Sequence, residues 1–108
     1  YILKKYEFYN MRTNEMQPLS FTIEHIMPES SNNNECGMIG NMLPLGETLN
    51  SQLEAKPFEQ KIQKYPESQY CSVKKFVKEY KTYKKWTNEM IEERTKAIAS
   101  ALYDYKEY

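Results

Sequence analysis

The chain has 108 residues, in which 15 Lys and Arg balance 15 Asp and Glu, together with one histidine and two cysteines. No apolar run approaches the ~18 residues that a membrane-spanning helix requires, so we expect one small soluble domain over residues 1–108 and no membrane partner. Cys36 and Cys71 are not part of a CxxC pair, and one histidine cannot complete a four-ligand Cys/His site, so no structural zinc is expected.

The cysteine content and the first residue bear on where the protein acts. Two cysteines without a signal-peptide pattern favour a reducing, cytoplasmic location, although their spacing leaves a single disulfide open. Because the chain begins with Tyr1 instead of Met, we expect it to be the C-terminal part of a longer protein.

The first half of the chain predicts a short helix followed by two strands. Residues 1–9 have a loose helical pattern, and residues 10–19 have none and are expected to form a loop. Residues 21–26 contain a β-branched and aromatic run, Phe21, Thr22, Ile23 and Ile26, that Pro28 ends, which predicts a strand of about six residues. After a Ser/Asn-rich loop at 30–35, the apolar run 38–45 predicts a second strand, although Gly40 and Pro44 interrupt it.

From residue 46 onward the apolar residues recur at helical spacing. This spacing predicts four helices, at about 46–55, 58–65, 73–80 and 87–105. Arg94 lies within the apolar stripe of the last helix, where we expect it to pair with a carboxylate at the edge of the core or to contact a phosphate. Strands followed by helices predict an α+β fold.

The balanced net charge conceals a basic middle segment. Residues 52–85 hold nine basic and four acidic residues, whereas the segments on either side are acidic. Such a segment could present a positive face to a phosphate backbone, or its lysines could simply be solvated on the outer faces of helices.

The pair Glu24-His25 is the first candidate for chemistry. A neutral imidazole can accept a proton near neutral pH, and a neighbouring carboxylate supplies a hard oxygen ligand for Mg²⁺. Adjacent side chains of a regular strand point to opposite faces, so the two can act at one site only where the strand ends or twists, which Pro28 makes plausible. Alone, a single histidine is more often structural than catalytic.

Two asparagines extend this candidate site. Asn50, early in the first predicted helix after the strands, could supply an amide oxygen to a metal held by Glu24, with water and substrate phosphate completing the coordination. Asn41 could fix a loop by hydrogen bonds. Each asparagine alone is equally typical of a turn or a helix cap.

Several segments occur together and in order: residues 24–28 (EHIMP), residues 39–45 (IGNMLPL), Asn50, then Phe58, Lys61, Tyr65 and Ser68. They resemble the C-terminal HNH domain of GmrSD-type restriction endonucleases, with weaker similarity at Trp86, Ile91 and Arg94. The resemblance implies a ββα-metal (HNH, or His-Me) finger, with a core at about 20–56 and C-terminal helices at about 58–106. Met42 and Pro44 depart from the family pattern, and Pro44 brings the length of the second strand into doubt.

The resemblance also implies roles for individual residues. His25 would be the general base that activates water, Glu24 and Asn50 would bind one divalent metal, Mg²⁺ or Mn²⁺, and Asn41 would hold the histidine-bearing loop. Lysines near the metal and along the basic segment are candidates for contacting DNA phosphates; they are Lys56, Lys61, Lys74, Lys75 and Lys78.

The resemblance implies a metal-dependent DNA endonuclease domain of a modification-dependent or phage-defence restriction system. Its partners would be DNA and an N-terminal NTP-using sensor region. A catalytically inactive nucleic-acid-binding or structural domain on the same scaffold is the alternative. We expect it less, because Glu24, His25 and Asn50 occur together and none has an obvious packing role. An all-helical interaction module would leave the Glu-His pair unexplained.

Overall fold

A computed structural model describes residues 2–10, 21–28, 34–54 and 56–103 of the chain. Most of the loop predicted at 10–19 and much of the loop predicted at 30–35 lie outside the described residues.

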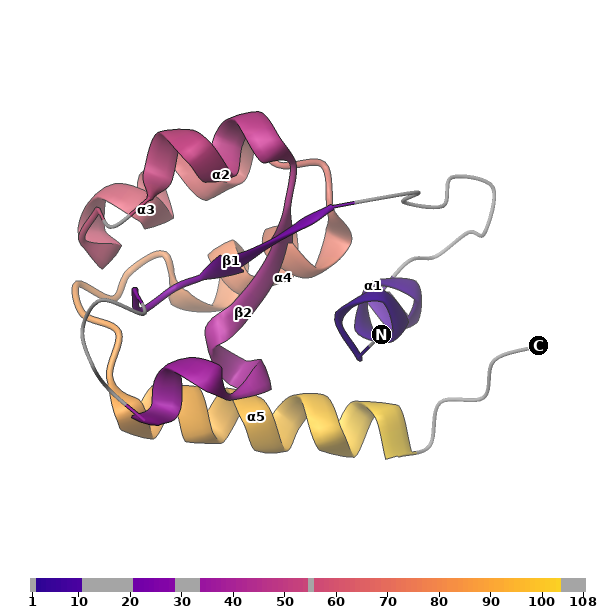
Figure 1. Ribbon diagram of the computed structural model, residues 1–108. Coiled ribbons are helices and arrows are strands. Elements are labelled where there is room, and N and C mark those ends of the chain that lie inside the picture. The colour runs from indigo at the N-terminus through magenta and orange to yellow at the C-terminus, as the bar shows by residue number, and fades with distance from the viewer. Residues whose placement is uncertain (1, 11–20, 29–33, 55, 104–108) are drawn as a thin grey trace.

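The described residues form an α+β fold that is mostly helical and contains a two-stranded antiparallel sheet (Figure 1). In chain order the elements are α1 (Ile2–Asn10), β1 (Thr22–His25), the 3₁₀ turns η2 (Asn34–Gly37) and η3 (Ile39–Asn41), β2 (Met42–Leu45), α2 (Glu47–Leu53), α3 (Phe58–Lys64), η4 (Tyr65–Glu67), α4 (Cys71–Tyr80) and α5 (Asn88–Tyr103). The α+β class is therefore confirmed, and the all-helical alternative is wrong because β1 and β2 pair. None of the described helices is long and apolar enough to cross a membrane.

The sheet register explains how β2 accommodates Pro44. Glu24 pairs with Leu43 and Ile23 pairs with Pro44, and beyond the strands the Ile26 amide donates to the Asn41 carbonyl at 2.9 Å. Because hydrogen-bonded and non-hydrogen-bonded pairs alternate along an antiparallel ladder, Pro44 falls at a non-hydrogen-bonded position. Its missing N–H therefore costs no bond to β1.

The second strand is shorter than predicted, because residues 39–41 turn away from the sheet. The Gly40 amide donates to Thr95 Oγ1 at 2.9 Å, and the Gly40 carbonyl accepts from Arg94 at 3.0 Å. Both backbone groups of Gly40 are therefore bonded to α5. The run 38–45 thus divides into a 3₁₀ turn on α5 and a four-residue strand.

The core lies where the sheet meets the helices that follow it. Its largest members are aromatic: Trp86 stacks on Phe58 with ring centroids 5.8 Å apart and meets Phe76 edge to face at 5.1 Å. The helical stripes predicted by spacing supply the rest, including Leu53, Ile62, Val73, Ile91 and Ile98. These contacts fix α3, α4 and α5 relative to the sheet.

Arg94 binds backbone carbonyls, and not the carboxylate expected for it, within the described residues. It is 5% exposed, and its Nη1 donates to the carbonyls of Gly40 and Met42 at 3.0 and 2.9 Å. The guanidinium also lies 5.2 Å from the centroid of the Phe76 ring, and burial lowers the pKa of Arg94 from its usual value. Among the described residues no carboxylate forms an ion pair with it. Arg94 therefore joins α5 to the 3₁₀ turn and to β2.

Candidate functional site

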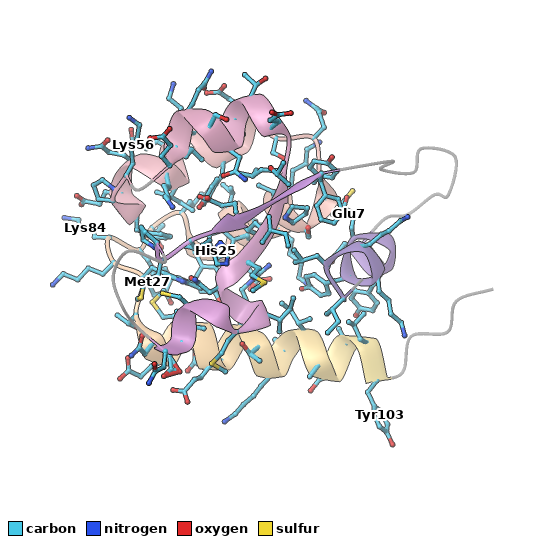
Figure 2. All side chains as sticks on the ribbon, in the orientation of Figure 1. Glu7, His25, Met27, Lys56, Lys84 and Tyr103 are labelled. Atoms are coloured by element: carbon cyan, nitrogen blue, oxygen red, sulfur yellow. The ribbon has the colours of Figure 1, made fainter. Side chains whose placement is uncertain are left out.

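The site predicted from sequence centres on the end of β1. His25 is the last residue of that strand, is half-buried, and pairs with Met42 across the sheet. Figure 2 shows His25 where the two strands lie together. Glu24 precedes it and is 2% exposed. Since the strand alternates its side chains, Glu24 leaves β1 on the buried face and His25 on the other.

Asn41 fixes the backbone just beyond His25. Its Oδ1 accepts the Met27 amide at 2.7 Å, and its Nδ2 donates to the Met27 carbonyl at 3.0 Å. The same side chain donates to the Cys36 carbonyl at 3.1 Å and accepts the Trp86 indole N–H at 3.0 Å. All four hydrogen-bonding positions of this buried amide are used, and two of them hold Met27.

Glu24 belongs to a buried polar cluster with α3 and η4. Its Oε2 lies 3.0 Å from Lys61 Nζ and accepts the Tyr65 hydroxyl at 2.7 Å. Lys61 is fully buried, and its ammonium also donates to the carbonyls of His25 at 2.8 Å and Ile26 at 3.3 Å. Burial, and then the nearby Glu24 carboxylate, raise the pKa of Tyr65 well above its usual range. The cluster thus holds the backbone of His25 from the buried side.

Asn50 lies on α2 against the start of β1. Its Nδ2 donates to Thr22 Oγ1 at 2.7 Å and to the Ile23 carbonyl at 3.2 Å. Thr22 and Glu24 lie on one face of the strand, so these contacts bring Asn50 to the face from which Glu24 leaves β1. Asn50 therefore has a structural role that its sequence position did not reveal.

The donor chemistry of Glu24 and Asn50 fits a divalent cation. Within the described residues, Oε1 of Glu24 and Oδ1 of Asn50 accept no hydrogen bond, while the second polar atom of each side chain is anchored by the protein. Anchoring of this kind commonly orients metal ligands. Two protein oxygens with water and phosphate suit Mg²⁺, although the Lys61 charge beside Glu24 weakens its attraction for a cation. No described group of three or more His, Cys, Asp and Glu could hold a metal.

The five lysines expected to contact DNA lie in different environments. Lys56 is exposed between α2 and α3, and Lys74, Lys75 and Lys78 are exposed on α4. The phosphate contact predicted for Lys61 is wrong. Its side chain is 0% exposed and its ammonium contacts three protein oxygens, so it cannot reach a phosphate in this structure.

The apolar spacing of α3 contains a signal that Lys61 is buried. Phe58, Lys61, Ile62 and Tyr65 occupy one helical stripe, and a lysine inside an apolar stripe faces the core together with its neighbours. Trp86 is a second residue whose contact was missed, because the pairing of its indole with Asn41 joins segments 45 residues apart.

Comparison with known families supports the resemblance found in the sequence. The pattern described as the C-terminal domain of GmrSD restriction endonucleases matches residues 1–101. Comparison with curated proteins and with solved structures gave no match. Because the match spans nearly the whole chain, this chain belongs to the family of C-terminal domains of GmrSD restriction endonucleases.

Proposed function

We propose that this chain is the DNA-cleaving domain of a restriction endonuclease and hydrolyses phosphodiester bonds as an HNH-type nuclease. Family membership supports a role related to restriction endonucleases, with DNA as the substrate. The observation that carries the proposal is the fixed position of His25. The backbone around it is bound by Lys61 on one side and, through Met27, by Asn41.

His25 is the proposed general base. Its neutral imidazole takes a proton from the attacking water, a step that contributes roughly 10²- to 10⁴-fold to the rate when the base is positioned. Asn41 and Lys61 act as positioning residues, since Lys61 binds the His25 carbonyl and Asn41 binds the backbone of Met27, two residues further on.

We propose that Glu24 and Asn50 hold a divalent cation, Mg²⁺ or Mn²⁺, on a ββα-metal finger made by β1, β2 and α2. The oxygens available for it are Oε1 of Glu24 and Oδ1 of Asn50. A cation bound there would polarise the scissile phosphate and stabilise the departing oxygen.

Plasmid nicking by the purified chain tests this function. We expect conversion of supercoiled to nicked DNA with Mg²⁺ or Mn²⁺ and none with EDTA. Asn50→Ala should lose that conversion, whereas Ser51→Ala, an exposed neighbour on α2, should keep it. Thermal melting of each variant shows whether it is folded. Nicking that is equal with EDTA, or unchanged in folded Asn50→Ala, would contradict the proposed metal ligand.

A second candidate function is a nucleic-acid-binding domain without turnover. The structure weakens the objection to it, because Glu24 and Asn50, two of the three residues on which that objection rests, have structural contacts. Their joint presence therefore does not by itself require catalysis. If the folded chain binds DNA, and neither it nor the full-length protein with NTP cuts DNA with either cation, this function would be favoured.

The restriction system around the domain is also part of the proposal. We infer that it acts with an N-terminal NTP-using region in modification-dependent or phage-defence restriction. Cleavage of modified DNA by the full-length protein should then require NTP, and should be lost when His25 is replaced. NTP-independent cleavage would contradict the sensor role.

A further inference from the structure

A short basic loop connects α4 to α5. Residues 81–85 (KTYKK) are all exposed and contain three lysines and no acidic residue; we call them the basic loop. In the part of the chain that the structure describes, Lys81, Lys84 and Lys85 form no ion pair. Tyr83 at its centre is 50% exposed. The loop therefore presents positive charge that no neighbouring carboxylate within the described residues neutralises.

The basic loop is attached to a rigid support. Trp86 follows it directly, is 7% exposed, and stacks on Phe58 with centroids 5.8 Å apart. At the start of the loop the Tyr83 amide donates to the Tyr80 carbonyl at 3.0 Å, and the two tyrosine rings meet edge to face at 5.6 Å. Both ends of the loop are therefore fixed to the aromatic core.

One oxygen atom joins this support to the segment that follows His25. Asn41 Oδ1 accepts both the Trp86 indole N–H at 3.0 Å and the Met27 amide at 2.7 Å. Figure 1 shows the α4–α5 connection at the end of the molecule where β1 terminates, and Figure 2 shows Lys84 and Met27 at that same end. The basic loop thus lies beside the strand end that carries His25.

The first lysines of α4 lie elsewhere. Lys75 Nζ is 5.8 Å from the ring centroids of both Tyr6 and Tyr9 on α1. The same end of α4 is capped by Glu7, which accepts the amides of Cys71 and Ser72 at 2.7 and 2.8 Å. In Figure 2, Glu7 lies on the opposite side of the molecule from Lys84. The start of α4, together with Lys75, therefore lies away from the end of β1.

We infer that the basic loop is the surface that holds the DNA backbone beside His25, in preference to the lysines at the start of α4. The inference rests on the proposed function and names the part of the domain that contacts its substrate. Lysine ammonium groups bind phosphate oxygens and release condensed counterions, and the Tyr83 hydroxyl can donate to a phosphate oxygen. A loop fixed at both ends places these contacts at a constant position relative to the imidazole.

Two double substitutions with equal charge change test the inference. Lys84→Gln/Lys85→Gln alters the loop, and Lys74→Gln/Lys75→Gln removes an adjacent pair of exposed lysines from α4. Fluorescence anisotropy of a labelled DNA duplex, in EDTA to prevent metal-dependent cleavage, gives the dissociation constant at several salt concentrations. All four positions are exposed, so unchanged melting temperatures are expected to show intact folds.

We expect the loop variant to weaken binding about tenfold or more and to reduce the slope of log K against log salt by about 2, because each of the two lysines neutralises one phosphate. The α4 variant should change binding by less than about threefold, which reflects net charge alone. Equal losses of affinity, or a larger loss in the α4 variant, overturn the inference while leaving the proposed function intact. Failure of the unaltered chain to bind DNA overturns both.

Discussion

Lys61 and Glu24 form an ion pair that is buried inside the protein, 3.0 Å from nitrogen to oxygen. The Lys61 ammonium has three hydrogens, and the oxygens of Glu24, His25 and Ile26 accept them. A buried charge that loses its partner is costly, because the remaining charge can neither reach water nor find another counterion.

Replacing Lys61 by Met should therefore lower the free energy of unfolding by about 3–5 kcal/mol. Lys64→Met, on the same helix, removes an exposed lysine whose pair with Glu67 is solvent-screened, and should cost less than about 1 kcal/mol. The double variant Glu24→Gln/Lys61→Met should recover part of the loss. Urea unfolding at pH 7 measures all three, and equal values for the two single variants would contradict the buried pair.

Tyr65 makes the cluster sensitive to alkaline pH. Because its pKa is raised in the folded protein, the folded state retains the phenol proton more strongly than the unfolded chain. This stabilisation is complete below pH ~10 and is lost as pH rises through the raised pKa. The stability advantage of the unaltered chain over Tyr65→Phe should shrink by about 1 kcal/mol between pH 8 and pH 10.5.

Urea unfolding at the two pH values measures this change. Tyr83 is exposed, so Tyr83→Phe is the control. The difference in unfolding free energy between the unaltered chain and this variant should be the same at both pH values. A constant difference between the unaltered chain and Tyr65→Phe would contradict the account of the cluster.

Sequence reasoning at the residue scale placed the candidate residues but not their partners. Glu24, His25 and Asn41 all lie at the end of the sheet, as the EHIMP and IGNMLPL segments indicate. The bond from Tyr65 to Glu24 spans 41 residues, and that from Trp86 to Asn41 spans 45. Local spacing contains no information on such contacts, since they arise from packing of whole helices on the sheet.

At the scale of elements, the 3₁₀ turn η3 packs directly against the backbone of α5. A Cβ built on Gly40 would lie 2.7 Å from the Thr95 nitrogen and would also collide with the Ile91 carbonyl oxygen. These are backbone atoms of a helix and cannot move aside locally. The glycine therefore sets the distance between the two elements, and with it the position of Asn41.

Gly40→Ala should destabilise the domain by more than about 3 kcal/mol or prevent folding, because the turn must leave the helix. Gly37→Ala is a matched control in the preceding 3₁₀ turn, where an added Cβ meets nothing within 4 Å. It should change stability by less than about 0.5 kcal/mol. Circular dichroism melting compares the two, and similar melting temperatures would contradict the close contact.

The end of α2 contains backbone strain at Glu54, whose φ is 41°. A side chain is disfavoured in that region and glycine is not, so Glu54→Gly should raise the free energy of unfolding by about 1 kcal/mol. Gln52→Gly, two residues earlier in the helix, should lower it by about the same amount. Opposite signs in urea unfolding are the expected result; destabilisation by Glu54→Gly would argue against strain at this position.

Helix boundaries were predictable because each apolar stripe packs on the core, as the four helices after residue 46 show. The strand predicted at 38–45 was too long for a physical reason. Its apolar residues indicated burial of Leu43 and Leu45 correctly, but a buried segment can also be a 3₁₀ turn, as at Gly40, whose backbone bonds to α5.

For the whole molecule, the arrangement of layers determines what each part of the basic segment does. The sheet packs with α2 on β1 and α4 on β2, while α5 contacts η3 (Figure 1). Lys61 consequently faces the core, the first lysines of α4 lie near α1, and the basic loop lies at the end of β1. The sequence predicted the positive segment, and the fold divides it into three environments.

Cleavage of plasmid DNA by His25→Ala, with and without added imidazole, tests directly whether His25 is the general base of a nuclease. We expect the unaltered chain to nick plasmid DNA with a divalent cation and the folded variant to be slower by roughly 10²- to 10⁴-fold. Imidazole should restore part of that rate, because it replaces the missing base. A folded His25→Ala chain that cuts at the unaltered rate would contradict the claim.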